Sequence, residues 1–168
     1  MRIWFDTEFI DDGTTIDVIS YGLARDDGAV YYAEAAEFDR SRMDGWCREN
    51  VLPHLTGQTK PRTQIAEEIR EFTQGVTEFW AHYAAYDWVA LCQLYGPLLD
   101  RPQGWPLLCR DTQLMRLDND IGPLPKQSTP EHHAGNDAAW ARDAHAFMEA
   151  VIEARRTEPV EDLGMVLG

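Results

Sequence analysis

The N-terminal part of the chain has the residue pattern of β-strands. Branched and aromatic residues dominate residues 2–10, and residues 18–25 and 29–33 have the same character. Asp26-Asp27-Gly28, between the last two of these segments, is a turn sequence typical of a β-hairpin. We therefore expect the domain to open with three consecutive strands.

After these strands, helical spacing of apolar residues alternates with short apolar runs. Residues 63–74 and 136–156 carry apolar side chains three or four positions apart, which predicts helices. A glycine and three prolines predict a loop over residues 118–131. The other predicted elements are a short helix at 44–55, a strand at 78–82, a helix at 87–95 and a strand at 107–115.

The order of these elements indicates an α/β fold. Three strands followed by alternating helices and strands predict a mixed sheet of five strands, antiparallel on one side and flanked by helices. The length of 168 residues fits a single domain over residues 1–168, with residues 157–168 as a frayed tail. The hydrophobic content of 44% is too high for a disordered chain.

The formal net charge of −14 at pH 7 restricts the partners of the protein. Proteins that hold long duplex nucleic acid use Lys and Arg to neutralise phosphates, so the acidity argues against extended duplex binding. It does not argue against binding the end of a short strand. Most acidic residues are expected to form a solvated surface, whereas some could hold metal ions that attract a phosphate.

The cysteines and the N-terminus indicate the cellular compartment. Cys47, Cys92 and Cys109 are widely spaced, which argues against a disulfide framework and against a zinc ribbon. Free thiols are typical of a reducing compartment. No signal peptide is recognisable at the N-terminus, and no segment is long and apolar enough to span a membrane. We expect a cytoplasmic protein without a membrane partner.

Four carboxylates and one histidine are the candidate catalytic residues. Asp6 and Glu8 lie two positions apart in the first strand, so their side chains should share one face. Two like charges so close are unfavourable unless a cation lies between them. Asp87 begins a predicted helix, and His132 and Asp137 flank the start of the last helix. Carboxylate oxygens suit Mg²⁺ or Mn²⁺, and a histidine can accept a proton near neutral pH.

Each of these residues also has an ordinary structural explanation. Asp87 could cap its helix, and the helix dipole could favour Asp137 in a first turn. Glu8 could be a solvated strand residue. Taken singly, each structural explanation is as good as the functional one or better. Five such residues, in order and on suitable elements, make coincidence a poor explanation for the whole set.

Three short motifs contain these five residues. They read Asp6-Thr7-Glu8 at the end of a strand, Ala84-Ala85-Tyr86-Asp87, and His132-His133-Ala134-Gly135-Asn136-Asp137. In this order they resemble the three exonuclease motifs of the DEDDh 3′→5′ exonuclease family. The resemblance implies a ribonuclease H-like fold and two Mg²⁺ ions, for which Mn²⁺ would substitute. By the same resemblance His132 is the general base, His133 occupies a variable position, and the metal ligands are Asp6, Glu8, Asp87 and Asp137.

Two positions depart from the family pattern. Phe9 follows the Asp-x-Glu motif where family members often have Thr, and Tyr83 stands where they often have Asn. Neither position is an expected metal ligand, but both would form part of the wall around the terminal nucleotide. Phe9, Tyr83 and Tyr86 are candidate substrate-binding residues because aromatic rings stack on bases. Core packing is the alternative role for these rings.

Over nearly the full chain the sequence resembles the small bacterial polyadenylate-specific exoribonucleases of the exoribonuclease AS family. That resemblance implies single-stranded RNA with a free 3′ hydroxyl as substrate, a preference for adenine-rich 3′ ends, release of nucleoside monophosphates, and a homodimer. Three alternatives stay open from the residues alone. They are an exonuclease for DNA or short oligonucleotides, a catalytically idle nucleic-acid-binding module, and an acidic adaptor with accidental motifs.

Overall fold

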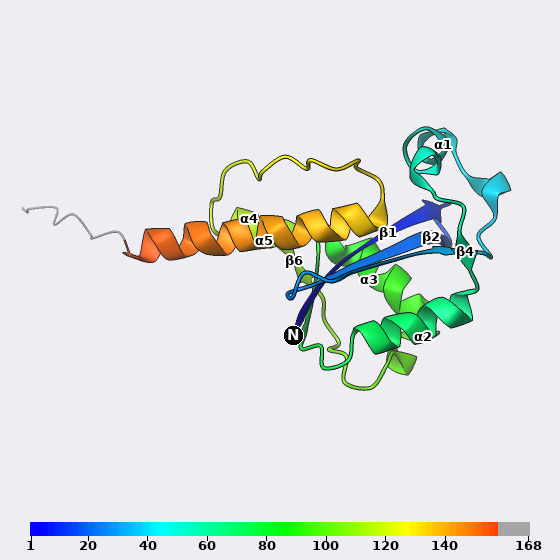
Figure 1. Ribbon diagram of the computed structural model, residues 1–168, viewed down its shortest axis with the longest axis horizontal. Helices are drawn as coiled ribbons and strands as arrows, with labels where there is room; N and C mark the ends of the chain where they lie inside the picture. Colours follow the sequence, from blue (N-terminus) through cyan, green and yellow to red (C-terminus); the bar gives the residue numbers. More distant parts are fainter. Residues whose placement is uncertain (158–168) are drawn as a thin grey trace, which may run out of the picture.

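Three antiparallel strands form the N-terminal half of the sheet in the computed structural model, which describes residues 1–157 (Figure 1). β1 spans Arg2–Asp11, β2 spans Ile16–Arg25 and β3 spans Val30–Ala35. β1 pairs antiparallel with β2, and β2 pairs antiparallel with β3. The predicted opening of three consecutive strands is confirmed.

Three further strands complete a six-stranded mixed sheet in the order β4-β3-β2-β1-β5-β6. β5 (Glu78–Ala81) pairs in parallel with β1, and β6 (Arg110–Asp111) pairs in parallel with β5. β4 (Thr59–Lys60) pairs in parallel with β3 at the other edge. The α/β class is confirmed, and the architecture is compatible with a ribonuclease H-like fold. The sheet has six strands rather than five because the two-residue β4 is too short to leave a pattern in the sequence.

Helices cover both faces of this sheet (Figure 1). The long α5 lies on one face, whereas α2 and α3 lie on the other. The α-helices are α1 (Gly45–Asn50), α2 (Arg62–Phe72), α3 (Ala84–Gln93), α4 (Thr112–Asp118) and α5 (Ala134–Thr157). The short 3₁₀ helices are η1 (Arg40–Arg42), η2 (Leu52–His54) and η3 (Leu98–Asp100).

The side chains of β1 alternate between two hydrophobic cores. Ile3 and Phe5 pack in the core formed with α2 and α3. Trp4 belongs instead to the core formed with α5. Because successive side chains of a strand point to opposite faces, Asp6 and Glu8 share the α5 face with Trp4. The alternation of β1 therefore directs both carboxylates towards α5.

The predicted strand at 107–115 is wrong over most of its length. Only Arg110–Asp111 is a strand, and α4 begins at the next residue. The Asp111 side chain accepts hydrogen bonds from the backbone N–H groups of Gln113 and Leu114, which caps α4. Such a cap contributes about 1 kcal/mol to a helix. In this protein the cap ends β6 at Asp111, although apolar residues continue into α4.

Two predicted helices also have different boundaries. The helix expected at 87–95 begins at Ala84, so Asp87 lies in its first turn instead of capping it. The helix expected at 44–55 is divided into α1 and η2, with a proline near the start of η2. The physical reason is that proline lacks the backbone N–H that a continuing α-helix requires.

The last helix is slightly longer than the pattern predicts. It begins at Ala134 rather than at residue 136, and Thr157, the first residue of the predicted frayed tail, is its last residue. Residues 158–168, the rest of that tail, lie outside the described part of the chain. Among helices in residues 1–157, none has both the length and the apolar character needed to cross a bilayer.

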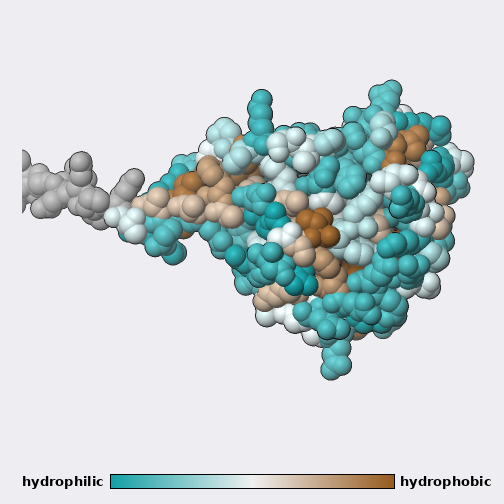
Figure 2. Space-filling model, in the orientation of Figure 1, coloured by the Kyte–Doolittle hydropathy of each residue, from teal (hydrophilic) through white to brown (hydrophobic). Residues whose placement is uncertain are grey.

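Hydrophilic residues cover much of the face shown in Figure 2, and hydrophobic residues form small patches on it. Some acidic side chains are paired with arginines, as Asp17 is with Arg62 at 2.5 Å. The chain has 29 acidic residues and 15 basic ones, so one-to-one pairing leaves many carboxylates to water. Solvation of these groups agrees with the acidic surface expected from composition.

Buried aromatic contacts hold the middle of α5 on the sheet. His145 of α5 lies between Trp4 and Trp80, and its Nδ1 accepts a hydrogen bond of 2.9 Å from Trp4 Nε1. Burial lowers the pKa of His145 to about 4, so the ring stays neutral at pH 7. These contacts fix the register of α5 along the strands.

A glycine in β2 allows the first turn of α5 to touch the sheet. Gly22 is the partner of Asp6 in the β1–β2 register. A Cβ atom at Gly22 would overlap with backbone atoms of Ala134 and Gly135. The absence of a side chain therefore brings the start of α5 next to the strand residue that pairs with Asp6.

We predict that Gly22→Ala destabilises the protein, because the added methyl group meets rigid backbone and has no room to move. The expected loss in the free energy of unfolding is about 3 kcal/mol or more. Gly45→Ala is the matched control, because a Cβ at Gly45 has no neighbouring atom within 4 Å. Urea unfolding of the two variants and the wild type measures the difference. Equal stability of both variants would show that α5 can shift away from Gly22 without cost.

Candidate active site

A cavity of about 790 Å³ brings the five predicted residues together. Asp6, Glu8, Asp87, His132 and Asp137 all line it. They come from β1, α3, the segment before α5, and α5 itself, which are far apart in the sequence. A cavity of this size is in the usual range for small-molecule sites.

β1 supplies two of the carboxylates beside an irregularity in the sheet. Glu8 pairs with Ser20 and Phe9 pairs with Val18, so Ile19 of β2 is an extra residue. Such β-bulges increase the local twist of a strand pair and frequently occur beside active sites. Glu8 is 8% exposed, so its carboxylate is mostly removed from water.

α3 supplies Asp87 from its first turn. Its Oδ1 accepts hydrogen bonds from the backbone N–H of Thr7, at 2.9 Å, and from the Thr7 hydroxyl, at 2.5 Å. Asp87 is therefore held against β1 at Thr7, the residue that separates Asp6 from Glu8 in the sequence. The left-handed backbone of Tyr83, with φ of 60°, turns the chain from β5 into α3 immediately before the first residue of that helix.

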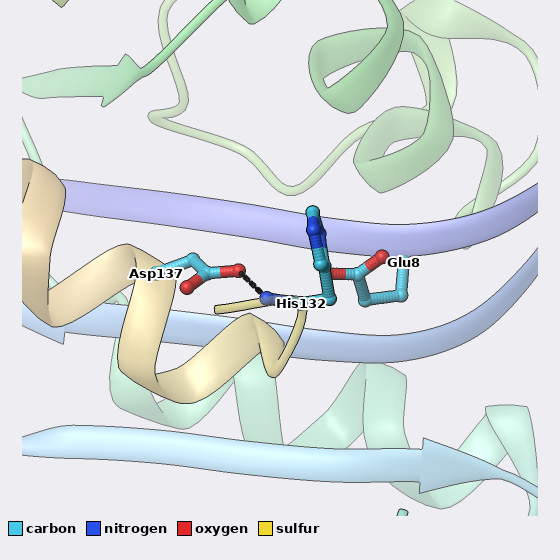
Figure 3. A group of neighbouring side chains, drawn as sticks. All are labelled: Glu8, His132 and Asp137. Carbon is cyan, nitrogen blue, oxygen red and sulfur yellow. Dashed lines mark hydrogen bonds between the residues drawn. The ribbon is translucent and has the colours of Figure 1, made fainter. Parts of the chain in front are cut away.

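Asp137 and His132 are held together at the start of α5. The backbone N–H of His132 donates to Asp137 Oδ2 at 2.9 Å, and Gln127 Nε2 donates to Asp137 Oδ1 at 2.5 Å. His132 has φ of 62°, a conformation that costs energy for a residue with a side chain. Glu8, His132 and Asp137 each offer one ligand atom, and these atoms lie within 4.8 Å of one another (Figure 3). Asp6 and Asp87 line the same cavity but are not part of this tightest group.

Burial raises the pKa values of the four carboxyl groups, and neighbouring carboxylates raise those of Asp6, Glu8 and Asp87 further. Burial, with smaller contributions from neighbouring carboxylates, raises the pKa of Glu8 to about 8 and that of Asp87 to about 6. Burial first, and then Asp87, Glu8 and Asp137, raise the pKa of Asp6 well above its usual value. Burial also raises the pKa of Asp137. Such a group of acids is stable near neutral pH only with bound protons or a bound cation.

The candidate substrate-binding aromatics lie in two different environments. Phe9 and Tyr83 line the cavity. Tyr86 does not line it; its ring stacks on Phe9 with centroids 6.1 Å apart and is 55% exposed. Phe9 is thus placed between the cavity and an aromatic neighbour, and Tyr86 extends the same apolar surface away from the carboxylates.

The structure adds cavity residues that the sequence pattern did not reveal. Trp46 of α1 is 52% exposed, and its ring meets His132 edge to face with centroids 4.9 Å apart. Lys126, Gln127 and Trp140 also line the cavity. None of them stands in a recognisable motif, so only the tertiary arrangement could identify them.

His133 has a structural role beside its neighbour. Its ring stacks on Tyr32 with centroids 4.0 Å apart. Its carbonyl accepts hydrogen bonds from the backbone N–H groups of Asn136 and Asp137, and its Nδ1 accepts one of 3.3 Å from Asn136. His133 therefore anchors the first turn of α5, whereas His132 faces the cavity.

Comparison with known proteins identifies the family. No known protein-family model matches the chain. The chain is 39% identical over 146 residues to the 3′-5′ exoribonuclease Rv2179c of Mycobacterium tuberculosis strain ATCC 25618 / H37Rv, covering 82% of this chain and 87% of that protein. The same values hold for the 3′-5′ exoribonuclease MT2234.1 of strain CDC 1551 / Oshkosh. The chain belongs to the family of these 3′-5′ exoribonucleases.

We predict that ionisation of the Glu8 carboxyl lowers the stability of the metal-free protein as pH rises from about 4.5 to about 8. The folded state raises the pKa of Glu8 from its ordinary 4.5 to about 8. In this window folded Glu8 retains a proton that the unfolded chain has released, so raising the pH favours unfolding. Glu8→Gln should reduce this pH dependence and raise the melting temperature at pH 8 by about 5 °C.

Thermal melts in EDTA between pH 5 and pH 8.5 measure this effect. Glu153→Gln, which changes a carboxylate on the exposed side of α5 near Arg156, is the control and should follow the wild type. If Glu8→Gln and the wild type lose stability in parallel, the Glu8 carboxyl is not a source of the pH dependence.

Proposed function

We propose that this protein is a metal-dependent exoribonuclease that removes nucleotides one at a time from the 3′ end of single-stranded RNA. The observation that carries the proposal is the convergence of four carboxylates on one cavity. The family relationship to two proteins named 3′-5′ exoribonucleases supports the same reaction. The four carboxylates and His132 are the proposed catalytic residues.

The donor atoms of the cavity suit two Mg²⁺ ions, with Mn²⁺ as a substitute. All four proposed ligands, Asp6, Glu8, Asp87 and Asp137, offer carboxylate oxygens, and hard divalent cations prefer oxygen ligands. Burial and the neighbouring charges of Asp87, Glu8 and Asp137 raise the pKa of Asp6, so a cation held by these carboxylates would relieve the repulsion among them. Bound ions would supply positive charge for the phosphate and for the oxygens on either side of it.

His132 is the proposed general base. Its ring lines the cavity, and one ring nitrogen lies within 4.8 Å of a Glu8 oxygen and of an Asp137 oxygen. From that position it can accept a proton from the attacking water, a contribution worth about 10²- to 10⁴-fold in rate. The backbone hydrogen bond from His132 to Asp137 fixes the histidine relative to a proposed ligand.

The substrate part of the proposal is RNA with an adenine-rich 3′ end and a free 3′ hydroxyl, released as nucleoside monophosphates. Phe9 and Tyr83 place aromatic rings in the wall of the cavity, where they can stack on a terminal base. The acidic surface offers little attraction for a duplex, which favours a single strand. We also propose a homodimer as the active form.

We predict that each substitution Asp6→Asn, Glu8→Gln, Asp87→Asn and Asp137→Asn lowers kcat/KM at least about 100-fold. Each change removes an anionic ligand without creating a cavity, so the variants should fold. Mg²⁺ should raise the melting temperature of the wild type, because it binds the folded state alone, and raise that of the variants less. Near-normal turnover of any variant would remove that residue from the proposed site.

Substitutions of the two adjacent histidines should have different effects on turnover and on stability. His132→Ala should lower kcat about 100-fold or more while Mg²⁺ still raises the melting temperature. His133→Ala should lower the melting temperature, since it removes the stacking on Tyr32 and a hydrogen bond at the start of α5. Loss of the Mg²⁺-induced shift in His132→Ala would instead make His132 a metal ligand.

The substrate is tested with 3′-labelled RNA of mixed sequence that ends in adenines. We expect immediate release of labelled mononucleotide, suppression by a blocked 3′ hydroxyl, and resistance of duplex ends. Cytosines in place of the terminal adenines should slow the reaction. Equal rates on both ends would contradict the adenine preference only, whereas cleavage of circular RNA would contradict the exonuclease proposal itself.

A further inference from the structure

Within the cavity lining, Lys126 is the only lysine or arginine. Apart from Tyr83, the other ionisable side chains there are carboxylic acids and histidines. The whole chain contains two lysines, Lys60 and Lys126. Lys60 forms an ion pair of 2.7 Å with Glu68, away from the cavity. Lys126 is exposed and has no acidic partner within 4.0 Å in residues 1–157, even though the cavity contains several acids.

The residues on both sides of Lys126 are hydrogen-bonded to α5. Trp140 Nε1 donates to the carbonyl of Pro125 at 2.9 Å, immediately before the lysine. Gln127, immediately after it, donates to Asp137 at 2.5 Å. Farther along, Asn136 Nδ2 donates to the carbonyl of Pro130 at 3.1 Å. The segment runs alongside α5 in Figure 1, and these hydrogen bonds hold the part of it that carries Lys126.

Lys126 also lies between two neighbouring hollows. It lines the large cavity and a second one of about 290 Å³, which is bounded by the same segment and by α5. Pro125, Gln127 and Trp140 are shared by both hollows in the same way. The shared residues place the two hollows side by side, with Lys126 on the border between them.

We infer that Lys126 binds an RNA backbone phosphate next to the scissile one. This inference rests on the proposed function. A cation without an acidic partner, held by its neighbours at the mouth of an acidic cavity, is suited to an anion that arrives with the substrate. Lys126 also lines the smaller hollow, whose lining contains none of the proposed metal ligands, so the phosphate it meets there is an adjacent one. Lys126 is thus a substrate-binding residue that acts on KM.

Steady-state kinetics on single-stranded RNA test this role with three variants. Lys126→Gln should raise KM about fivefold and leave kcat within about twofold, because a single phosphate contact is lost. Its KM should also depend less on salt, with the slope of log KM against log salt concentration smaller by about 0.7. Lys126→Arg keeps the charge and should resemble the wild type. Lys60→Gln, which removes the other lysine, is the matched control and should also resemble it.

Chemical labelling gives a second measurement that does not depend on turnover. An amine-reactive acetylating reagent, followed by mass spectrometry, reports the reactivity of each lysine in the Glu8→Gln variant. Single-stranded RNA should protect Lys126, and Lys60 serves as the internal reference in the same sample. Unchanged KM and salt slope in Lys126→Gln, or unchanged reactivity of Lys126 with RNA, would overturn the inference. Absence of RNA hydrolysis by the wild type would instead contradict the proposed function.

Discussion

The close approach of α5 to the sheet at Gly22 is the contact on which the candidate site depends. It places the first turn of α5 beside the residue that pairs with Asp6. Buried contacts of His145 with Trp4 and Trp80 hold the same helix farther along. Because a helix is stiff, these two contacts together determine where Asp137 lies relative to β1.

The group of carboxylates shows a conflict between stability and function. Burial and mutual repulsion raise the pKa values of these acids, which means that ionising them costs free energy in the folded protein. Specific hydrogen bonds from the surrounding structure hold the carboxylates in place and offset part of that cost. Thr7 holds Asp87, and the backbone of His132 holds Asp137. An arrangement that is unfavourable alone and fixed by its neighbours is typical of a cation-binding site.

The overall acidity of the chain has different meanings at the surface and in the cavity. At the surface, the excess of acidic over basic residues leaves carboxylates in water and gives no attraction for long nucleic acids. Inside the cavity, the acids are buried and act as a group. We infer that Lys126, which lines this cavity, offers an anion a local attraction. A polyanionic substrate would therefore be recognised at one place rather than along a broad face.

The sequence by itself determined the α/β class of the fold and identified five residues that line the cavity, Asp6, Glu8, Asp87, His132 and Asp137. Strand alternation and helical spacing are local properties, so the three opening strands and α5 could be predicted, as could Asp6 and Glu8 on one face. Only the tertiary structure decided how Trp46, Lys126 and Trp140 join the cavity. The tertiary structure also decided that the short strands β4 and β6 pair with β3 and β5 at the two edges of the sheet. These features depend on contacts between distant segments, and a pattern of neighbouring residues carries no information about such contacts.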